Sequence, residues 1–115
     1  MIRVNIIDDR RIIESVVESP AENVNIAWAQ EGAVSPGYCV FTSEGEILTV
    51  ADKDNVAELL VRAALNHLDL NGIETGFSKN EELFPFLKSI GFNQVGNKCS
   101  VNLKTFFKPC GGCKS

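Results

Sequence analysis

The sequence predicts a single α+β domain in which helices cover both faces of a mixed, twisted sheet. Two observations lead to this prediction. Segments with the alternating pattern of strands and segments with helical periodicity follow one another in the order β-α-β-β-β-α-β-α-β-β. The longest helical segment, Val56 to Leu70, is apolar around most of its circumference, so we expect it to lie against the sheet with a narrow solvent face.

Length and composition are those of an ordinary globular domain. The chain has 115 residues, a formal net charge of −4, 44% hydrophobic residues and 23% charged residues. We expect one domain over residues 1–108 and a loose tail over residues 109–115. The sequence shows no membrane-spanning run and no signal or transit peptide, and its acidic balance argues against nucleic acid as a partner. These features predict a cytoplasmic protein with four reduced cysteines.

The first part of the chain predicts four strands and one helix. Residues 2–7 alternate as a strand with one buried side. Asp8-Asp9 marks the start of a helix that Pro20 ends, and its apolar stripe consists of Ile12, Ile13, Val16 and Val17. Strands are expected over residues 24–29, 38–42 and 47–51, and a turn at residues 43–45 joins the last two into a hairpin.

The second part of the chain begins with the long helix. Asn55 and Glu58 have the spacing of a capping box, and Asn71-Gly72 marks the helix end. A strand over residues 73–77 follows, then a short helix to residue 90 whose first turn is loosened near Pro85. Two strands complete the prediction, over residues 92–95 and 98–107.

Residues 37–107 resemble the C-terminal two-thirds of the GNAT acetyltransferase superfamily. The stretch Gly37 to Phe41 (GYCVF) looks like the strand that the family writes as G-aromatic-x-hydrophobic, and Ile47 to Val50 looks like its central strand. The stretch Phe86 to Phe92 (FLKSIGF) resembles its L-Y-x-x-L-G-F signature. The resemblance implies a GNAT-like fold and direct transfer of an acetyl group from acetyl-CoA to an amine.

The resemblance also implies where acetyl-CoA would bind. The pyrophosphate would meet backbone amides at the start of the long helix, and the pantetheine arm would follow the central strand where it separates from its neighbour. Glu46 is the candidate general base, because a Glu on the central strand often acts through water in the family; the alternative is a solvated turn residue. The matching cofactor positions are Val50, Ala51, Lys53, Asn55, Val56, Ala57 and Asn80.

Three features depart from the family pattern. The family's phosphate loop reads Q/R-x-x-G-x-G/A, whereas residues 51–57 (ADKDNVA) contain no glycine. Leu87 stands where the family often has a tyrosine that protonates the leaving thiolate, and Tyr38 is distant in the sequence. Residues 8–23, between the first two strands, are short for the helices that shape the acceptor side. Two functions stay open: an N-acetyltransferase, and a GNAT-fold binding or dimerisation module without CoA.

A third hypothesis concerns thiols. Cys110 and Cys113 form a C-x-x-C pair, a spacing that suits a metal or redox site. A zinc site needs four ligands, which Cys39, Cys99 and His67 would have to complete. The alternative is that Cys39 and Cys99 are core thiols and that His67 is a hydrogen-bonded core imidazole.

Aromatic side chains have two open interpretations. They could line a pocket for the acceptor amine, or they could pack in the core. Phe106 and Phe107 cannot both face inward on one strand, so one of them is expected to be exposed and would suit a homodimer contact. The candidates for the acceptor pocket are Trp28, Tyr38, Phe41, Phe77, Phe84 and Phe86.

Overall fold

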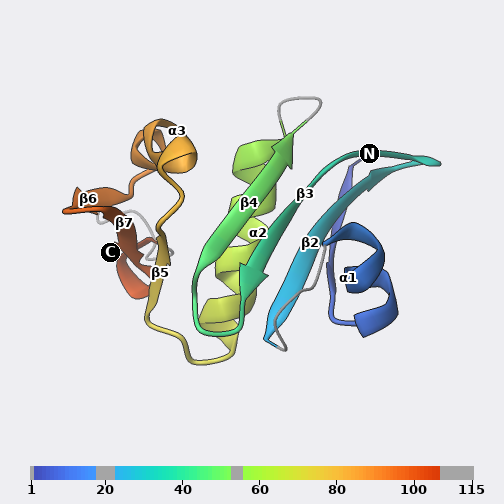
Figure 1. Cartoon of the computed structure of the whole chain (residues 1–115), viewed down its shortest axis with the longest axis horizontal. Coiled ribbons are helices and arrows are strands. Elements are labelled where there is room, and N and C mark those ends of the chain that lie inside the picture. Colours follow the sequence, from blue (N-terminus) through green and yellow to red (C-terminus); the bar gives the residue numbers. More distant parts are fainter. Residues whose placement is uncertain (1, 18–22, 53–55, 107–115) are drawn as a thin grey trace, which may run out of the picture.

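Four antiparallel strands form the central sheet of the computed structural model, which describes residues 2–17, 23–52 and 56–106 (Figure 1). Each strand pairs with the next one along the chain. A second, three-stranded antiparallel sheet has the order β5-β7-β6. The strands of the first sheet are β1 (Arg3–Ile7), β2 (Val24–Glu31), β3 (Val34–Thr42) and β4 (Ile47–Asp52); those of the second are β5 (Thr75–Ser78), β6 (Asn93–Val95) and β7 (Lys98–Asn102).

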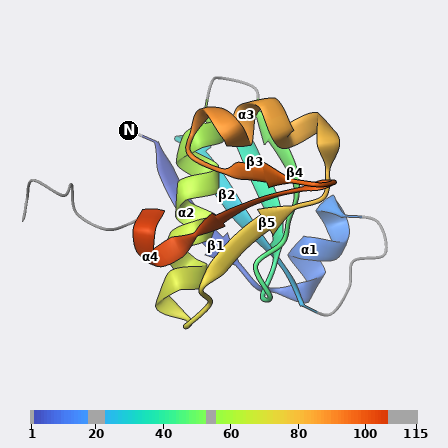
Figure 2. The same cartoon turned by 90° about the vertical axis from the view of Figure 1, so that its left-hand side faces the viewer.

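Helices cover both faces of the central sheet, as the sequence predicted. Helix α1 (Arg10–Val16) begins at Asp9, whose carboxylate accepts a 2.9 Å hydrogen bond from the amide of Arg11. Its one fully buried residue, Ile13, packs with Val24, Ile26 and Val40. Helix α2 (Ala57–Leu70) lies on the opposite face (Figure 2).

The main core lies between α2 and the two sheets. Leu60, Val61, Ala64, Leu65 and Leu68 are the buried residues of α2. They belong to one apolar cluster with side chains from both sheets, so α2 holds the two sheets in one domain. The members from the sheets include Ala27, Ala29, Cys39, Phe41, Cys99 and Val101.

The exposed face of α2 is wider than the sequence predicted. The helical wheel placed only polar residues in solvent, but the side chains of Leu59 and Leu70 are 44% and 77% exposed. Both residues lie next to the polar Asn66 on the helical wheel. Because they are exposed, the sheets do not cover this side of α2. The expectation of a narrow polar face was therefore wrong on this side of the helix.

The C-terminal strand is also shorter than predicted. Strand β7 ends at Asn102, and residues 103–106 form a helical turn, α4 (Leu103–Phe106). The side-chain oxygen of Asn102 accepts hydrogen bonds from the amide of Thr105 at 3.0 Å and from its hydroxyl at 3.3 Å. This local capping bond starts a helix that the alternating pattern had concealed.

The remaining elements differ from the prediction mainly at their ends: α1 ends at Val16, before the stop expected at Pro20, and β3 begins at Val34 and not at residue 38. The 3-10 turn η1 (Glu81–Leu83) precedes helix α3 (Phe84–Ser89), so the loosened first turn expected near Pro85 is present. Phe106 is half-buried against the main core, whereas Phe107 and the tail lie outside the described residues. Asn55, the predicted cap of α2, also lies outside them. No helix in the described ranges is both long and apolar enough to span a membrane.

Candidate functional site

The start of β4 lies beside the end of β5. A parallel bridge joins Glu46 to Phe77, and the amide of Phe77 donates a 2.8 Å hydrogen bond to the carbonyl of Gly45. Beyond this point β4 is the last strand of one sheet and β5 the last strand of the other. Figure 1 shows the two strands moving apart towards the end of β4 that leads into α2.

Two polar side chains stand at the point of divergence. The buried hydroxyl of Ser78 donates to the carbonyl of Ile47 at 2.8 Å, and the side-chain amide of Asn80 donates to the carbonyl of Leu48 at 3.1 Å. Leu48 is the extra residue of a bulge, because Val40 pairs with Thr49 while Phe41 pairs with Ile47. The carbonyls of Ile47 and Leu48 therefore accept hydrogen bonds from side chains and not from the backbone of a neighbouring strand.

The outer edge of β4 is open beyond Leu48. No strand among the described residues pairs with that edge from Thr49 to Asp52. Backbone donors and acceptors on an unpaired edge can bind an extended ligand in the manner of an added strand. The open edge therefore offers a backbone binding surface next to the gap between the sheets.

The start of α2 lies beside this edge. Its N-cap residue, Val56, has an apolar side chain that cannot accept a hydrogen bond from the amides of the first turn. A Cβ atom built on Gly37 would overlap the carbonyl oxygen of Ala51 and lie 3.1 Å from Cγ2 of Val56, so the three residues meet. The positive end of the helix dipole is thus placed next to the end of β4.

The structure brings together part of the predicted cofactor site. Val50 and Ala51 lie on the open stretch of β4, and Val56 and Ala57 lie at the start of α2. Asn80 lies at the divergence, with its side-chain amide bonded to β4 and its side-chain oxygen accepting from the amide of Glu82 at 3.2 Å. Lys53 and Asn55 lie outside the described residues.

Glu46 lies at the other end of β4, where the two sheets are still joined. Its amide donates to the hydroxyl of Thr42 at 3.1 Å, and its carbonyl accepts from the amide of Thr42 at 2.8 Å. The side chain is half-buried beside the hairpin turn. The structure therefore does not bring Glu46 together with Val50, Ala51 and the start of α2, and its role as a base stays a prediction.

Tyr38 is distant from the end of β4 in the sequence but lies beside it in the structure. In the sheet it pairs directly with Ala51 on β4 and with Trp28 on β2. Its ring stacks on the Trp28 ring with a centroid distance of 5.7 Å and an interplanar angle of 11°. Part of the signal was present in the hairpin: counting outward from the turn at residues 43–45 places position 38 opposite position 50, and the bulge at Leu48 moves this pairing to Ala51.

The buried cysteines are core residues. Cys39 and Cys99 are fully buried free thiols. Desolvation by burial raises the pKa of the Cys39 thiol to about 12, so this group stays protonated at neutral pH and is a poor nucleophile. The structure therefore supports the interpretation of Cys39 and Cys99 as core thiols.

The described ranges hold no group of three or more His, Cys, Asp or Glu side chains that could bind a metal ion. His67 is half-buried, with an edge-to-face contact to Phe41 at a centroid distance of 5.9 Å. Its Nε2 lies 3.5 Å from the side-chain nitrogen of Asn71. Cys110 and Cys113 fall outside the described residues, so the C-x-x-C hypothesis stays a prediction.

Comparison with known proteins gave matches among solved structures. No family model matches the sequence, and no curated protein matches it. A protein from Desulfovibrio desulfuricans described as an acetyltransferase of the GNAT family is 14% identical with a TM-score of 0.61, and the match covers 90% of this chain and 98% of that one. The ribosomal-protein-S18-alanine N-acetyltransferase from Escherichia coli is 10% identical with a TM-score of 0.64, and the match covers 90% and 94%.

A third structure is a PaiA N-acetyltransferase from Thermoplasma acidophilum in complex with coenzyme A. It is 16% identical with a TM-score of 0.54, and the match covers 68% of this chain and 58% of that one. At these identities the likeness shows the fold. The chain therefore has the GNAT-like fold that its motifs predicted, a mixed α+β domain with the central sheet between helices.

Proposed function

We propose that this chain is an acetyl-CoA-dependent N-acetyltransferase that acts on an amine. The observation that carries the proposal is the open edge of β4 beside the start of α2. A cofactor with an amide-bearing arm and a pyrophosphate needs an unpaired strand edge and a helix N-terminus next to each other. The names of the structural neighbours, one of them a complex with coenzyme A, support the same function.

The residues of this site fit the cofactor as follows. The backbone of Val50 and Ala51 would bind the amides of the pantetheine arm, and the first amides of α2 would bind the pyrophosphate. When bound, acetyl-CoA supplies a thioester whose acetyl group passes to the amine. Tyr38 is half-buried and pairs with Ala51 on β4, so its phenol is our candidate for the group that donates a proton to the departing sulfur.

Cofactor binding is tested by thermal denaturation in the presence of acetyl-CoA. A ligand that binds only the folded state raises the melting temperature with increasing ligand concentration. We expect a saturable rise at or below about 1 mM acetyl-CoA. The absence of any rise at that concentration would overturn the proposal and leave the alternative of a GNAT-fold binding module without CoA.

A matched pair of variants locates the binding site. Ala57→Glu places a carboxylate in the first turn of α2, where it stabilises the helix but repels a pyrophosphate. Asn66→Glu adds the same charge at an exposed position in the middle of α2. We expect Ala57→Glu to weaken acetyl-CoA binding and Asn66→Glu to leave it unchanged. Equal affinities in the two variants would place the cofactor elsewhere.

A further inference from the structure

Helix α1 covers only one end of its face of the central sheet. Its core residue, Ile13, packs where β2 begins and β3 ends, against Val24, Ile26 and Val40. Figure 1 shows the far ends of β1 and β2 extending beyond the helix. The short connection over residues 8–23 leaves this end of the sheet without a second helix among the described residues.

Five side chains share this face beyond Ile13: Trp28 and Tyr38 are half-buried and pack against the cluster around Ile13, and three polar side chains farther out are exposed. Cross-strand partners lie on the same side of a sheet, and residues two apart on one strand do so as well. Arg3 pairs with Gln30, Asn5 pairs with Trp28, and Trp28 pairs with Tyr38. We call this set the open face; its members are Arg3, Asn5, Trp28, Gln30 and Tyr38.

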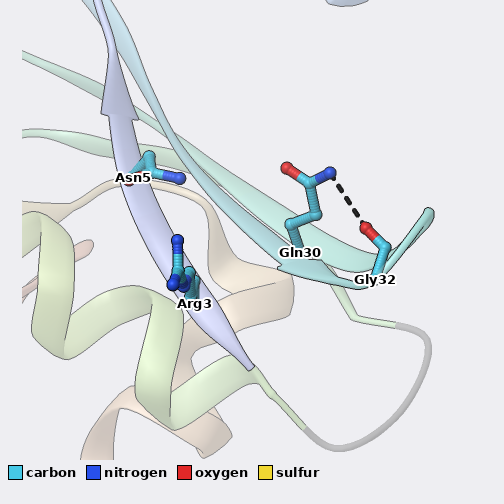
Figure 3. Close-up of a pocket in the computed structure, with 4 residues that line it drawn as sticks. All are labelled: Arg3, Asn5, Gln30 and Gly32. Atoms are coloured by element: carbon cyan, nitrogen blue, oxygen red, sulfur yellow. Dashed lines mark hydrogen bonds between the residues drawn. The ribbon is translucent and has the colours of Figure 1, made fainter. Parts of the chain in front are cut away.

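The outer part of the open face is a small pocket. Arg3, Asn5, Gln30 and Gly32 line a cavity of about 300 Å³ (Figure 3). The side-chain nitrogen of Gln30 donates a 3.1 Å hydrogen bond to the carbonyl of Gly32, which holds the Gln30 side chain against the hairpin. The exposed guanidinium of Arg3 and the amide of Asn5 make no side-chain hydrogen bond or ion pair with the described residues.

The charge of the open face selects an anion. The five residues carry one positive charge and no negative charge, in a chain whose net charge is −4. An unpaired guanidinium binds a carboxylate in a planar, bidentate geometry, and neighbouring amide groups add further hydrogen bonds. The stacked rings of Trp28 and Tyr38 continue this surface towards β4 with a flat apolar area.

We propose that the open face binds a peptide acceptor, with its free α-amine at β4 and a carboxylate side chain at Arg3. This inference rests on the proposed function. Neighbouring strands lie about 4.8 Å apart, so Arg3 on β1 lies about 14 Å across the sheet from β4. An extended peptide spans about 3.4 Å per residue, so the acidic residue stands about four residues after the amine.

The geometry assigns each part of the peptide a partner. The amine lies beside Ala51, the middle of the peptide lies on the rings of Trp28 and Tyr38, and the carboxylate binds Arg3. In the transfer, the amine nitrogen forms a bond to the acetyl carbon as the thioester C–S bond breaks. One proton leaves the nitrogen and one proton ends on the departing sulfur, so the step is balanced.

The fluorescence of Trp28 measures this binding directly, because the chain contains one tryptophan. The probe is a pentapeptide of four alanines followed by glutamate, with a free α-amine and an amidated C-terminus. We expect a saturable change in Trp28 fluorescence without acetyl-CoA. Replacement of the peptide's glutamate by glutamine should weaken binding about tenfold, since a hydrogen bond to a charged group is lost.

Two arginine variants form the matched pair. Arg3→Gln should weaken the binding of the glutamate peptide about tenfold. Arg11→Gln removes the same charge from α1, where the Arg11 side chain is 92% exposed and lies 3.8 Å from Asp9, and it should leave the affinity unchanged. Equal binding of both peptides to the parent chain, or equal affinities of the two variants, would overturn the inference.

The fluorescence titration separates this inference from the proposed function. If acetyl-CoA raises the melting temperature but the glutamate peptide leaves Trp28 fluorescence unchanged, the inference on the acceptor is wrong and the proposed function stands. If the peptide binds through Arg3 but acetyl-CoA does not raise the melting temperature, the proposed acetyltransferase function is wrong. The open face is then a peptide-binding surface without acetyl transfer.

Discussion

The buried hydroxyl of Ser78 donates a 2.8 Å hydrogen bond to the carbonyl of Ile47, across 31 positions of the sequence. The same oxygen accepts a 3.1 Å bond from the amide of Asn80. These bonds stand where β4 and β5 stop running side by side, and they satisfy backbone groups that a strand ladder would otherwise pair. Ser78 thus closes one end of the gap that the proposed cofactor site uses.

Ser78→Ala should destabilise the fold. The change leaves the buried carbonyl of Ile47 without its donor, at an expected cost of about 1–3 kcal/mol in the free energy of unfolding. Urea denaturation measures the loss. The control is Ser15→Ala, since the Ser15 hydroxyl donates to Ile12 on an exposed part of α1 and its removal should cost less than about 0.5 kcal/mol. Equal losses would contradict a structural role for Ser78.

Gly37→Ala should separate β3 from β4. The added methyl group would overlap the backbone carbonyl oxygen of Ala51, which cannot move without disturbing the hairpin. We expect a loss of more than about 2 kcal/mol. At Gly76 the same methyl group would lie 2.6 Å from Cδ2 of Leu65, the end of a side chain that can shift. Gly76→Ala should therefore cost less, and the opposite order in urea denaturation would contradict this packing.

Tyr38→Phe tests the phenol in the proposed transfer. The variant keeps the ring stacked on Trp28 and removes only the hydroxyl. If that hydroxyl donates a proton to the departing sulfur, kcat should fall about 10²-fold while the affinity for acetyl-CoA stays the same. An unchanged kcat would exclude Tyr38 as the acid.

Stability should fall in alkaline solution because of Cys39. Burial raises the pKa of its thiol from 9.0 to about 12, so the unfolded chain loses this proton at lower pH than the folded chain. The protonated thiol contributes fully to the free energy of unfolding below pH 9.0. This contribution falls by about 1.4 kcal/mol per pH unit as the pH rises towards 12. In Cys39→Ala this contribution is absent, so its urea midpoint should depend less on pH between about pH 8 and about pH 10. Parallel pH profiles of the two proteins would contradict the raised pKa.

Most elements could be predicted because their patterns are local. The apolar stripe from Val56 to Leu70 and the turn at residues 43–45 placed α2 and the hairpin correctly. The end of β7 was missed, since a capping bond from Asn102 outweighed the alternation that continues to Phe107. The exposure of Leu70 was missed because a helical wheel shows which residues share a face and not how far the sheet extends.

The candidate site was predicted only in part. The positions at the end of β4 and the start of α2 followed from the family resemblance. Val50 and Ala51 lie on β4 and Val56 and Ala57 lie at the start of α2, and their role in cofactor binding stays a prediction. Tyr38 is distant from the end of β4 in the sequence, and strand pairing decides its proximity. Trp28 and Tyr38 of the open face were candidates for the acceptor pocket. The polar part of this face was not foreseen, because Arg3 and Gln30 meet only through the pairing of β1 with β2.

The sequence by itself determined the order of strands and helices, because hydrophobic periodicity and capping residues act over a few positions. Only the tertiary structure decided which strand edge stays open and which polar groups face it. That decision depends on pairs such as Ser78 with Ile47 and Arg3 with Gln30, which lie far apart along the chain. Such pairs form only when the whole core packs, since burial and register are properties of the assembled sheets and not of any one segment.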